Sequence, residues 1–437
     1  LFARVWPDGK GVLSWSFDGT ARQWDLATHQ QIGPPMKGEG VLLSAIWLRD
    51  GERIATMSGD RTARLWDAAT GQRIGAEMKH DKPDVADFSV EVPLFYEILD
   101  YYDVVPAPDG KQLLTFANAF EARLWDEESG APAGKPMAHE SLVNGAVFSH
   151  DGTMIATWSG QSIIGQTDNS ARLWSSATTA PIGEKMTQTG AVRGAAFSPD
   201  DKRLATWTND GEVQLWDTAT AASVGPVMKH DRFVVGAAFS PDGKLVVSWS
   251  SDGLVKFWDA ATGEQAGRSL RHSGSVQSAE FYAGGRYLLT TDMTNSIRPQ
   301  VRVWDVFLRR EVMTLGVGAG LTLGAKWVEG DRLLTWGEGN AVQMWPADWF
   351  RPRESLAALA ADVCDRKLRA TGVELDTVNG RMWIGARRVT TADVDQAPVL
   401  AGREGEDVCA WRPQWYDQAL DVALGWIDQA GRASGRP

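Results

Sequence analysis

The sequence has little cysteine, no long apolar run and a deficit of positive charge. Two cysteines in 437 residues exclude a disulfide-stabilised scaffold and fit a reducing compartment, so we expect a cytoplasmic protein. No stretch of 18 or more apolar residues occurs, which excludes a transmembrane helix and gives no reason to expect a membrane partner. Lys and Arg number 44 against 56 Asp and Glu, a net charge of −12. This balance argues against a nucleic-acid partner, because binding to phosphates needs a basic surface.

The sequence also lacks the short motifs that carry common chemistry. There is no Gly-x-x-x-x-Gly-Lys-Ser/Thr phosphate loop, no His-Glu-x-x-His helix, no Cys-x-x-Cys pair and no Gly-x-Ser-x-Gly elbow. Only six histidines are present, too few for a convincing metal site. We therefore expect no catalytic residue, no cofactor and no metal ion.

Tryptophan, by contrast, is abundant, with 21 residues. Eight of them recur at intervals of 41 to 59 residues and are followed by a similar short segment. Self-similarity with a period just above forty residues is typical of repeat architectures. The eight anchors are Trp24, Trp66, Trp125, Trp174, Trp216, Trp258, Trp304 and Trp345.

The repeat unit is clearest at Gly236–Gly263, GAAFSPDGKLVVSWSSDGLVKFWDAATG. Three short apolar runs are separated by turn signals such as Pro-Asp-Gly and Ser-Asp-Gly, and a fourth run follows. Four strands every forty-odd residues are typical of a propeller blade. We predict an all-β protein, with an eight-bladed propeller of four-stranded antiparallel blades over residues 1–346. A small, mainly helical extension is predicted over residues 347–437.

This unit resembles a WD repeat, and the resemblance covers about Leu1 to Trp345. In that family a buried Trp bonds a Ser or Thr ten residues earlier. That hydroxyl is linked to a His 28 residues before the Trp, and the His is linked to an Asp six residues before the Trp. The sixth unit has the whole set, and others have parts of it, with seven extra residues in the fourth. The matching residues are His230, Ser248, Asp252 and Trp258; Thr206, Asp210 and Trp216; His139, Thr157, Asp168 and Trp174; Thr56, Asp60 and Trp66; and Ser14, Asp18 and Trp24. Gln188 and Gly38 stand at the His position of the fifth and second units.

We expect this set, called the relay below, to be structural. A buried indole N–H without an acceptor costs about 1–3 kcal/mol, and the relay satisfies it. His, Ser and Asp together also compose a catalytic triad, but an active site would be unique, whereas this set recurs from unit to unit. A further Trp follows the hydroxyl residue in several second strands and is expected to fill the space between blades: Trp15, Trp158, Trp207, Trp249 and Trp336. The same packing role is expected of Trp47 and Trp327.

Three insertions depart from the repeat, at Asp81–Asp103, Gly160–Thr167 and near Met293–Gln300. All fall in connections that the relay places at one end of the blades, so we expect them to project from one face. The first has seven acidic residues against one Lys, and three of the six tyrosines. Either it packs on its own blade, or it contacts a protein partner of basic character. In the second case the partner-binding candidates are Phe95, Tyr96, Tyr101 and Tyr102 as anchors, with Glu91, Glu97 and Asp100 for attraction.

The last 91 residues do not repeat. Helical spacing predicts helices over about residues 353–369 and 415–429. The tail resembles a short cap that follows the propeller in bacterial multidomain WD-repeat proteins, and the matching residues are Leu359, Cys364, Arg387, Val389, Thr390 and Cys409. Val389 departs from the Leu of that pattern. The two cysteines are expected to be buried thiols.

The resemblance implies a protein-interaction or sensing platform. The segments at Thr62–Gly71 and Phe239–Gly243 look like bacterial versions of the repeat. In such proteins the propeller commonly follows an NTPase, kinase or caspase-like domain, which is therefore expected upstream of Leu1 along with the outer strand of the last blade. Two alternatives stay open: a free-standing assembly scaffold, and an enzyme with a site at the axial pore. The pore site is disfavoured because the first strands contain mainly Gly, Ala, Val, Phe and Trp.

Overall fold

The described part of the chain is almost entirely β-strand. The computed structural model describes residues 2–6, 11–25, 27–48, 51–81, 102–117, 119–161, 168–294, 298–315, 322–328, 332–337, 341–345, 373–376, 381–384 and 387–388. The chain divides into two units. Unit 1 comprises Leu1–Ala279 with Asp292–Asn295, and unit 2 comprises Glu280–Thr291 with Ser296–Pro437.

Unit 1 contains six four-stranded antiparallel sheets, here called blades 1 to 6, in which the strands pair in chain order. Blades 1 to 3 are β1 (Phe2–Val5), β2 (Gly11–Trp15), β3 (Thr20–Asp25), β4 (Gln31–Lys37); β5 (Leu42–Trp47), β6 (Arg53–Ser58), β7 (Thr62–Asp67), β8 (Arg73–Lys79); and β9 (Tyr102–Pro106), β10 (Gln112–Ala117), β11 (Glu121–Asp126), β12 (Met137–Ala138). Blades 4 to 6 are β13 (Leu142–Phe148), β14 (Met154–Gln161), β15 (Ser170–Ser175), β16 (Pro181–Thr187); β17 (Val192–Phe197), β18 (Arg203–Thr208), β19 (Glu212–Asp217), β20 (Ser223–Lys229); and β21 (Val234–Phe239), β22 (Leu245–Ser250), β23 (Leu254–Asp259), β24 (Leu270–Arg271).

Blade 7 and the remaining sheets belong wholly or partly to unit 2. Blade 7 is β25 (Ser275–Tyr282), the short 3-10 turn η2 (Ala283–Gly285), β26 (Tyr287–Thr294), β27 (Arg298–Asp305) and β28 (Arg310–Leu315). The eighth repeat is the three-stranded sheet of β29 (Thr322–Val328), β30 (Arg332–Gly337) and β31 (Ala341–Trp345). The all-β class and seven four-stranded sheets are thus confirmed, and a ring of eight full blades stays a prediction.

The tail differs from the expectation in its described part. The described residues of the tail form a small antiparallel sheet of β32 (Val373–Asp376), β33 (Arg381–Ile384) and β34 (Arg387–Arg388). All three described elements of this mainly helical prediction are therefore strands. The two predicted helices, Cys364 and Cys409 lie outside the described residues. The predicted boundary at residues 346 and 347 falls inside unit 2.

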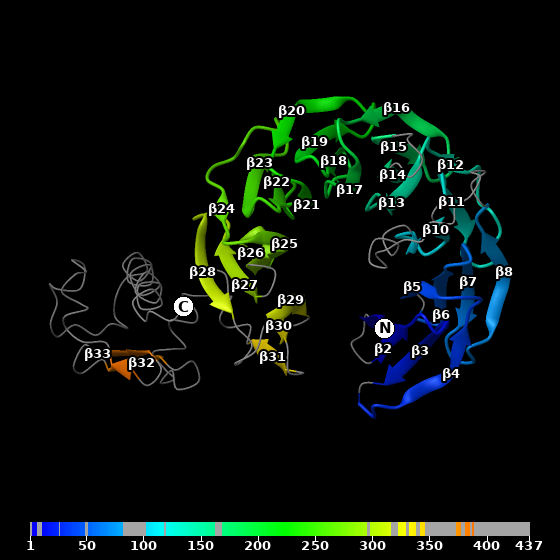
Figure 1. Ribbon diagram of the computed structural model, residues 1–437, viewed down its shortest axis with the longest axis horizontal. Coiled ribbons are helices and arrows are strands. Elements are labelled where there is room, and N and C mark those ends of the chain that lie inside the picture. Colours follow the sequence, from blue (N-terminus) through cyan, green and yellow to red (C-terminus); the bar gives the residue numbers. More distant parts are fainter. Residues whose placement is uncertain are drawn as a thin grey trace. The chain divides into compact units, whose positions relative to one another are not determined.

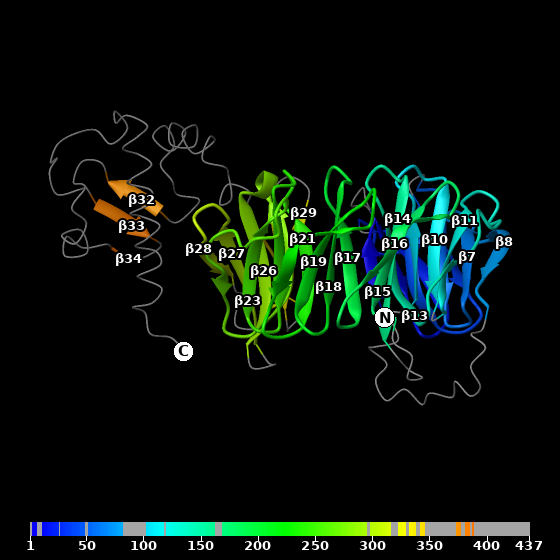
Figure 2. The ribbon, with the colours of Figure 1, turned by 90° about the horizontal axis from the view of Figure 1, so that it is seen from above.

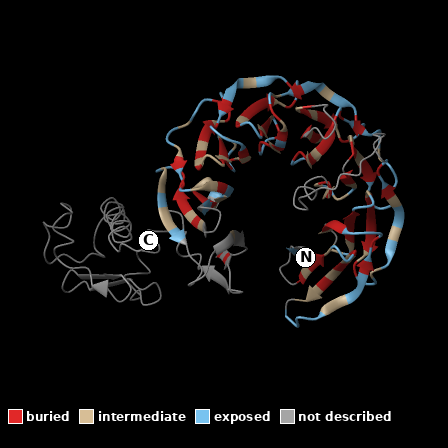
Figure 3. Cartoon of the chain, in the orientation of Figure 1, coloured by how far each residue is buried: buried red, intermediate tan, exposed pale blue. Residues whose placement is uncertain are grey.

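In unit 1 the blades follow one another side by side along an arc (Figure 1), and their strands run between two ends of the blades (Figure 2). The fourth strands β4, β8, β16 and β20 lie along the outer rim. These outer strands are the exposed part of each blade, whereas burial concentrates in the strands inside them (Figure 3). In β20, for example, only Met228 is buried, while β22 is buried at four of six positions.

Neighbouring blades are joined by mixed hydrophobic clusters. One cluster contains Ala205, Val213 and Leu215 of blade 5 and Phe239 and Trp258 of blade 6. The second-strand tryptophans contribute to these seams as predicted: Trp15, Trp158 and Trp207 pack in or against clusters that span two blades. The seams are aromatic and aliphatic, so burial of apolar area is the main source of cohesion between blades.

In blades 4, 5 and 6 a glycine on the first strand makes room for the second-strand indole. Gly236 pairs across the ladder with Trp249, and a Cβ at Gly236 would lie 2.2 Å from the indole ring. Gly145 and Gly194 face Trp158 and Trp207 in the same way. Blade 2 uses a different matched pair, with Ser44 opposite Met57.

The outer rim has a second recurrent close contact between blades. Gly225, in β20, has φ +67°, and a Cβ there would lie 1.9 Å from the carbonyl oxygen of Thr262 in the next blade. Thr262 belongs to a turn in which its N–H and hydroxyl both donate to Asp259 Oδ1. Since the same turn bond recurs at Thr28, Thr70, Ser129 and Thr220, these Asp-x-x-Thr/Ser turns present rigid backbone to the neighbouring blade.

We predict that Gly236→Ser destabilises the chain by about 1–3 kcal/mol, because the added atoms overlap Trp249. The same change combined with Trp249→Met recreates the Ser–Met pair of blade 2, so there its additional cost should be close to zero. Urea unfolding of the wild type, both single variants and the double variant measures this coupling. Simple additivity of the two changes would contradict the proposed size match.

Candidate functional site

The relay is complete in blade 6. Trp258 Nε1 donates to Ser248 Oγ over 2.7 Å, and His230 Nε2 lies 2.8 Å from the same oxygen. His230 Nδ1 lies 2.9 Å from Asp252 Oδ2, which also accepts the backbone N–H of Asp231 over 3.1 Å. The four side chains thus tie the connection that precedes the blade to the turn between its second and third strands.

Blade 4 has the same arrangement in spite of its insertion. Trp174 Nε1 donates to Thr157 Oγ1 over 2.8 Å, and His139 Nε2 lies 2.7 Å from that hydroxyl. His139 Nδ1 lies 3.2 Å from Asp168 Oδ2. The insertion at residues 160–167 therefore changes the length of the connection and leaves the relay geometry intact.

The electrostatics of the relay favour a neutral imidazole beside a carboxylate. Burial lowers the pKa of His139, although the hydrogen bond and charge of Asp168 act in the opposite direction. Burial alone would raise the pKa of Asp252, but hydrogen bonding to His230 and backbone N–H donors lowers it to about 2. With Nδ1–H donated to Asp and Nε2 accepting from the hydroxyl, the ring nitrogens are committed to the fold.

Blade 2 replaces the imidazole with a guanidinium. Trp66 donates to Thr56 over 2.8 Å, as the spacing predicts, and the His position is Gly38. Asp60 instead pairs with the buried Arg64 Nη2 over 2.7 Å. Burial would lower the pKa of Arg64, but the hydrogen bond and charge of Asp60 outweigh it and raise that pKa.

Blade 5 keeps the hydroxyl and the acid but has no imidazole. Trp216 donates to Thr206 over 2.8 Å. Asp210 accepts hydrogen bonds from the hydroxyls of Thr208 and Thr189, at 2.7 and 3.0 Å. Gln188 occupies the His position, and its side-chain amide has no hydrogen-bond partner among the described residues. The predicted relay residues Thr206, Asp210 and Trp216 are thus not joined into one chain of hydrogen bonds.

Blade 3 contains a relay histidine that spacing alone missed. His80 Nε2 lies 2.7 Å from Thr115 Oγ1, which accepts the indole N–H of Trp125 over 2.7 Å. Counting 28 residues back from Trp125 fails because the long insertion lies between. Lys79-His80-Asp81 repeats the Lys-His-Asp that opens blade 6, which could have identified it.

His80 also lacks the acidic partner that the relay histidines of blades 4 and 6 have. Ala119 stands where other units have the acid, and His80 Nδ1 is buried without a partner among the described residues. Burial, with Arg123 as a smaller cause, lowers the pKa of His80 to about 3. The folded protein therefore holds this imidazole neutral well below the pH at which a free one is protonated.

In blade 7 two of the relay contacts occur, with a different spacing along the chain. Within unit 2, Trp304 donates to Thr290 over 2.8 Å. Within unit 1, His272 Nδ1 lies 3.1 Å from Asp292 Oδ2. The acid Asp292 comes two residues after Thr290, the hydroxyl residue of the second strand. The position six residues before Trp304, where other units have the acid, is occupied by Arg298.

The relay defines one end of the blades of unit 1, called the relay face below. It is formed by the connections that lead into each first strand and by the turns between second and third strands. The connections β8–β9 and β14–β15, where two insertions occur, belong to this end. Of the predicted partner-binding residues, six lie outside the described residues: Phe95, Tyr96, Tyr101, Glu91, Glu97 and Asp100.

The expectation for Tyr102 needs correction. Tyr102 is the first residue of β9 and is 7% exposed, in a core cluster with Val104, Leu113 and Trp125. It lies in the seam between blades 2 and 3 and offers no surface to a partner. The alternation of a strand explains this placement, because Tyr102 and Val104 share the inward face.

Within unit 1, exposed apolar side chains concentrate on the relay face, whereas the exposed Phe307 and Leu308 belong to the β27–β28 turn of unit 2. Five large hydrophobic residues of unit 1 are between 36% and 49% exposed. Phe17 lies in the β2–β3 turn, Val41 and Phe233 lie in the connections that lead into β5 and β21, and Met293 lies near the end of β26. Only Val227, in the outer strand β20, lies elsewhere. Four of the five therefore belong to the relay face.

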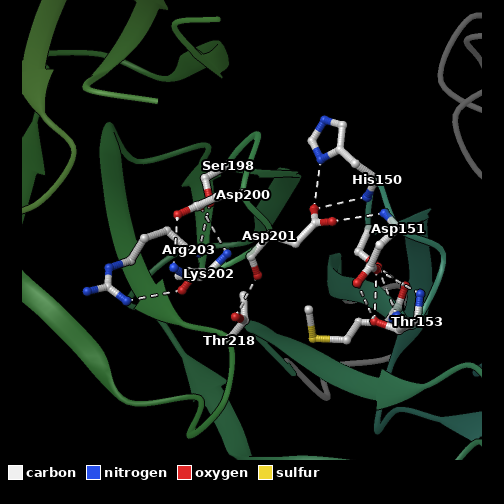
Figure 4. A network of polar contacts seen from close by, with 11 residues as sticks. His150, Asp151, Thr153, Ser198, Asp200, Asp201, Lys202, Arg203 and Thr218 are labelled. Atoms are coloured by element: carbon white, nitrogen blue, oxygen red, sulfur yellow. Dashed lines mark hydrogen bonds and ion pairs between the residues drawn. The ribbon is translucent and has the colours of Figure 1, made fainter. Parts of the chain in front are cut away.

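The opposite end of the blades carries a polar network that the sequence did not predict (Figure 4). The Asp201 carboxylate accepts the backbone N–H groups of His150 and Asp151, both over 2.9 Å, and lies 2.7 Å from His150 Nδ1. The hydroxyl of Thr218 donates to the carbonyl of Asp201 over 2.7 Å. This bridge joins the β13–β14 turn to the β17–β18 turn, so it fixes blade 5 against blade 4.

Neither a metal-binding cluster nor a membrane-spanning helix is found among the described residues. No group of three or more His, Cys, Asp or Glu side chains in this part of the chain is arranged to hold a metal ion. None of its helices is long and apolar enough to cross a membrane.

We predict that His80 makes the fold sensitive to mild acid. The unfolded chain takes up this proton near pH 6.5, whereas folded His80 does so only near pH 3, so stability falls as the pH falls through that interval. Between pH 7.5 and 5.0 His80 should contribute about 2 kcal/mol to this loss, and His80→Gln should reduce the loss by that amount. Urea unfolding at the two pH values measures this, with the exposed His29→Gln as control. An equal loss in His80→Gln and wild type would refute the assignment.

Comparison with known proteins agrees with this architecture. Three segments match the family model "WD domain, G-beta repeat", residues 131–175, 182–217 and 224–259, which span much of blades 4 to 6. No curated protein matches the chain. The crystal structure of the computationally designed Ika8 protein is similar in fold, with a TM-score of 0.58 and 17% identity over 77% of this chain and 93% of that chain. The chain therefore contains WD40 repeats in blades whose relays are described above.

Proposed function

We propose that the chain is a protein-interaction platform whose binding surface is the relay face. The observation that carries this proposal is the placement of Phe17, Val41, Phe233 and Met293 at one end of unit 1. Exposed apolar side chains gathered on one face are typical of a protein contact. WD40 repeats generally mediate protein–protein interaction or scaffolding, which supports the same conclusion.

The long insertion adds a second element to the proposed surface. Its sequence places aromatic residues among acidic ones, and it connects two blades at the relay face. We propose that Phe95, Tyr96 and Tyr101 anchor a partner, and that Glu91, Glu97 and Asp100 attract a basic one, since aromatic anchors dominate binding energy and charges steer encounter. Tyr102 has no part in this surface because it belongs to the core.

We further propose a non-enzymatic, regulatory role within a larger bacterial protein of the cytoplasm. The resemblance of the repeats to bacterial multidomain proteins and the scarcity of cysteine support this context. The relay histidines also support a non-enzymatic role, because their ring nitrogens are occupied by hydroxyl and carboxylate partners in blades 4 and 6. A free-standing scaffold would use the same face.

Phe233→Ser should reduce partner binding by about 2 kcal/mol, roughly thirtyfold, if the relay face is the contact surface. Val227→Ser is the matched control, since Val227 is similarly exposed but lies on the outer strand β20. Quantitative recovery of partners from native-host extract on the immobilised chain compares the two. Equal recovery with both variants, or selective loss with Val227→Ser, would contradict the proposal.

The insertion is tested in a second arm of that experiment. Tyr96→Ala with Tyr101→Ala should lower partner recovery and leave the melting temperature unchanged. Tyr102→Ala should instead destabilise the chain by about 3–5 kcal/mol through the cavity it leaves between two blades. Unchanged recovery with the double variant would show that the insertion does not contact the partner.

A further inference from the structure

The β27–β28 turn of blade 7 carries the most exposed large apolar side chain among the described residues. Phe307 is 86% exposed, and the neighbouring Leu308 is 38% exposed. Blades 1 to 6 have the same turn between their third and fourth strands, and the residue at the Phe307 position is exposed in all of them. That residue is small or charged: Ala27, Ala69, Glu128, Ala177, Ala219 and Ala261. The fold therefore does not require an aromatic residue at this position.

Leu308 also departs from the repeat, at a cost in hydrogen bonding. At its position five other blades have a Thr or Ser whose hydroxyl donates to the Asp that opens the turn, namely Thr28, Thr70, Ser129, Thr220 and Thr262. Leu308 has only the backbone bond, with its N–H donating to Asp305 Oδ1 over 2.8 Å. Two successive positions thus replace groups that suit the fold with exposed apolar side chains. Local conflicts of this kind are expected where residues serve binding.

Positive charge follows the apolar pair directly. Arg309 and Arg310 are partly buried, and Arg309 is charged at neutral pH although burial lowers its pKa to about 10. Asp305, the acid that opens the turn, is 4% exposed and pairs with Arg286 Nη2 over 3.2 Å. The turn therefore combines an apolar tip with a surplus of positive charge. Aromatic residues and arginine are enriched at protein interfaces.

The relay face of unit 1 has the complementary character around Phe233. Phe233 is 49% exposed, the highest value among the large hydrophobic residues of unit 1. Asp231 lies in the same connection. Asp210 lies in the neighbouring turn, where a Cβ at Gly211 would lie 2.8 Å from the carbonyl oxygen of Arg232. Both carboxylates are exposed, neither forms an ion pair with a described residue, and Arg232 is the single basic residue of these two segments.

We propose that the chain associates with a second copy of itself, with the β27–β28 turn of one chain docked on the relay face of the next. Phe307 packs against Phe233 of the second copy, and Leu308 adds apolar contact area. Asp210 and Asp231 attract the arginines beside the turn. This inference deepens the proposed function, on which it rests, by naming a second copy of the chain as a ligand of the relay face.

The contact joins two different surfaces, so each chain uses its turn once and its relay face once. Such a heterologous contact generates an open chain or a closed ring of copies rather than a two-fold dimer. A contact between the turns of two copies is disfavoured, because it would bring the arginines of both together. The charge distribution therefore selects the relay face of the second copy as the docking surface.

Sedimentation equilibrium of the full chain measures this association. The mean mass of the wild type should rise with concentration up to about 0.5 mM. Phe307→Ala should weaken association roughly tenfold through loss of the aromatic contact. Its melting temperature should not change, because Ala occupies this exposed position in five other blades. Val227→Ser, which alters an exposed apolar residue of the outer strand β20, is the control and should associate like wild type.

Leu308→Thr separates binding from stability. Thr restores the hydroxyl that donates to the turn Asp in other blades, so the melting temperature should stay the same or rise. Association should nevertheless weaken, because the apolar contact is lost. Asp231→Asn should weaken association about threefold by removing a charge beside Phe233. Asp242→Asn, in an exposed turn between first and second strands, is the matched control and should associate like wild type.

A mixture of two variants identifies the surfaces. Phe233→Ser and Phe307→Ala should each stay monomeric at concentrations where the wild type associates. Mixed in equal amounts they should form dimers, because the first retains its turn and the second retains its relay face. Larger species should not form, since the two surfaces left over are both altered.

Four results would overturn the proposal: a wild type that stays monomeric at about 0.5 mM, unaltered association of Phe307→Ala, an equal loss with Val227→Ser, or no dimer in the mixture. The recovery of partners from extract by Phe233→Ser and Val227→Ser is measured independently of self-association. Failure here is therefore distinguishable from failure of the relay face as a partner surface.

Discussion

A buried indole N–H needs an acceptor, and the geometry of each blade depends on supplying one. In seven successive blades the indole of the third-strand Trp donates to a Ser or Thr hydroxyl of the second strand, over 2.7–2.8 Å. A slip of one residue in either strand would turn the hydroxyl or the indole to the other face of the sheet. The bond therefore fixes the register of the central strand pair as well as satisfying a polar group that would otherwise cost about 1–3 kcal/mol.

The residues that complete the relay beyond the Ser or Thr hydroxyl differ from blade to blade. Blades 4 and 6 complete the relay with His and Asp, whereas blade 3 has the His without the acid. Blade 2 pairs its acid with Arg64, and blade 5 leaves the Gln188 amide without a partner among the described residues. Blade 1 retains the hydroxyl and acid beside a cavity. The bond from the indole to the hydroxyl is therefore constant, whereas the groups beyond the hydroxyl differ from blade to blade.

The sequence predicts the part of this structure that depends on short, constant spacings. The bond from Trp to hydroxyl spans ten residues within one hairpin in most blades, so counting residues finds it. The histidine lies across the connection between blades, whose length varies, and His80 is missed for that reason. Contacts between blades, such as the bridge from Asp201 to His150, depend on how turns meet in space and leave no periodic signal.

The sequence also did not distinguish exposed from buried residues within the long insertion. Tyr102 closes the acidic segment in the sequence, yet it begins strand β9 and packs in the seam between two blades. The strands of the tail had a local signal, since Asn379-Gly380 separates two alternating segments, but helical spacing on either side outweighed it. The four exposed apolar residues of the relay face could not be recognised from sequence, because buried and exposed apolar residues occur in the same turns.

The central claim, that completion of the relay sets the local stability of each blade, is tested most directly by hydrogen exchange of the indole N–H groups. The signals are assigned by single Trp→Phe variants and followed by NMR in deuterated buffer. Trp174 and Trp258, at the complete relays, should exchange slowest, and Trp216, whose blade has Gln188 in place of the histidine, should exchange at least tenfold faster. Exchange at Trp216 as slow as at Trp258 would contradict the account.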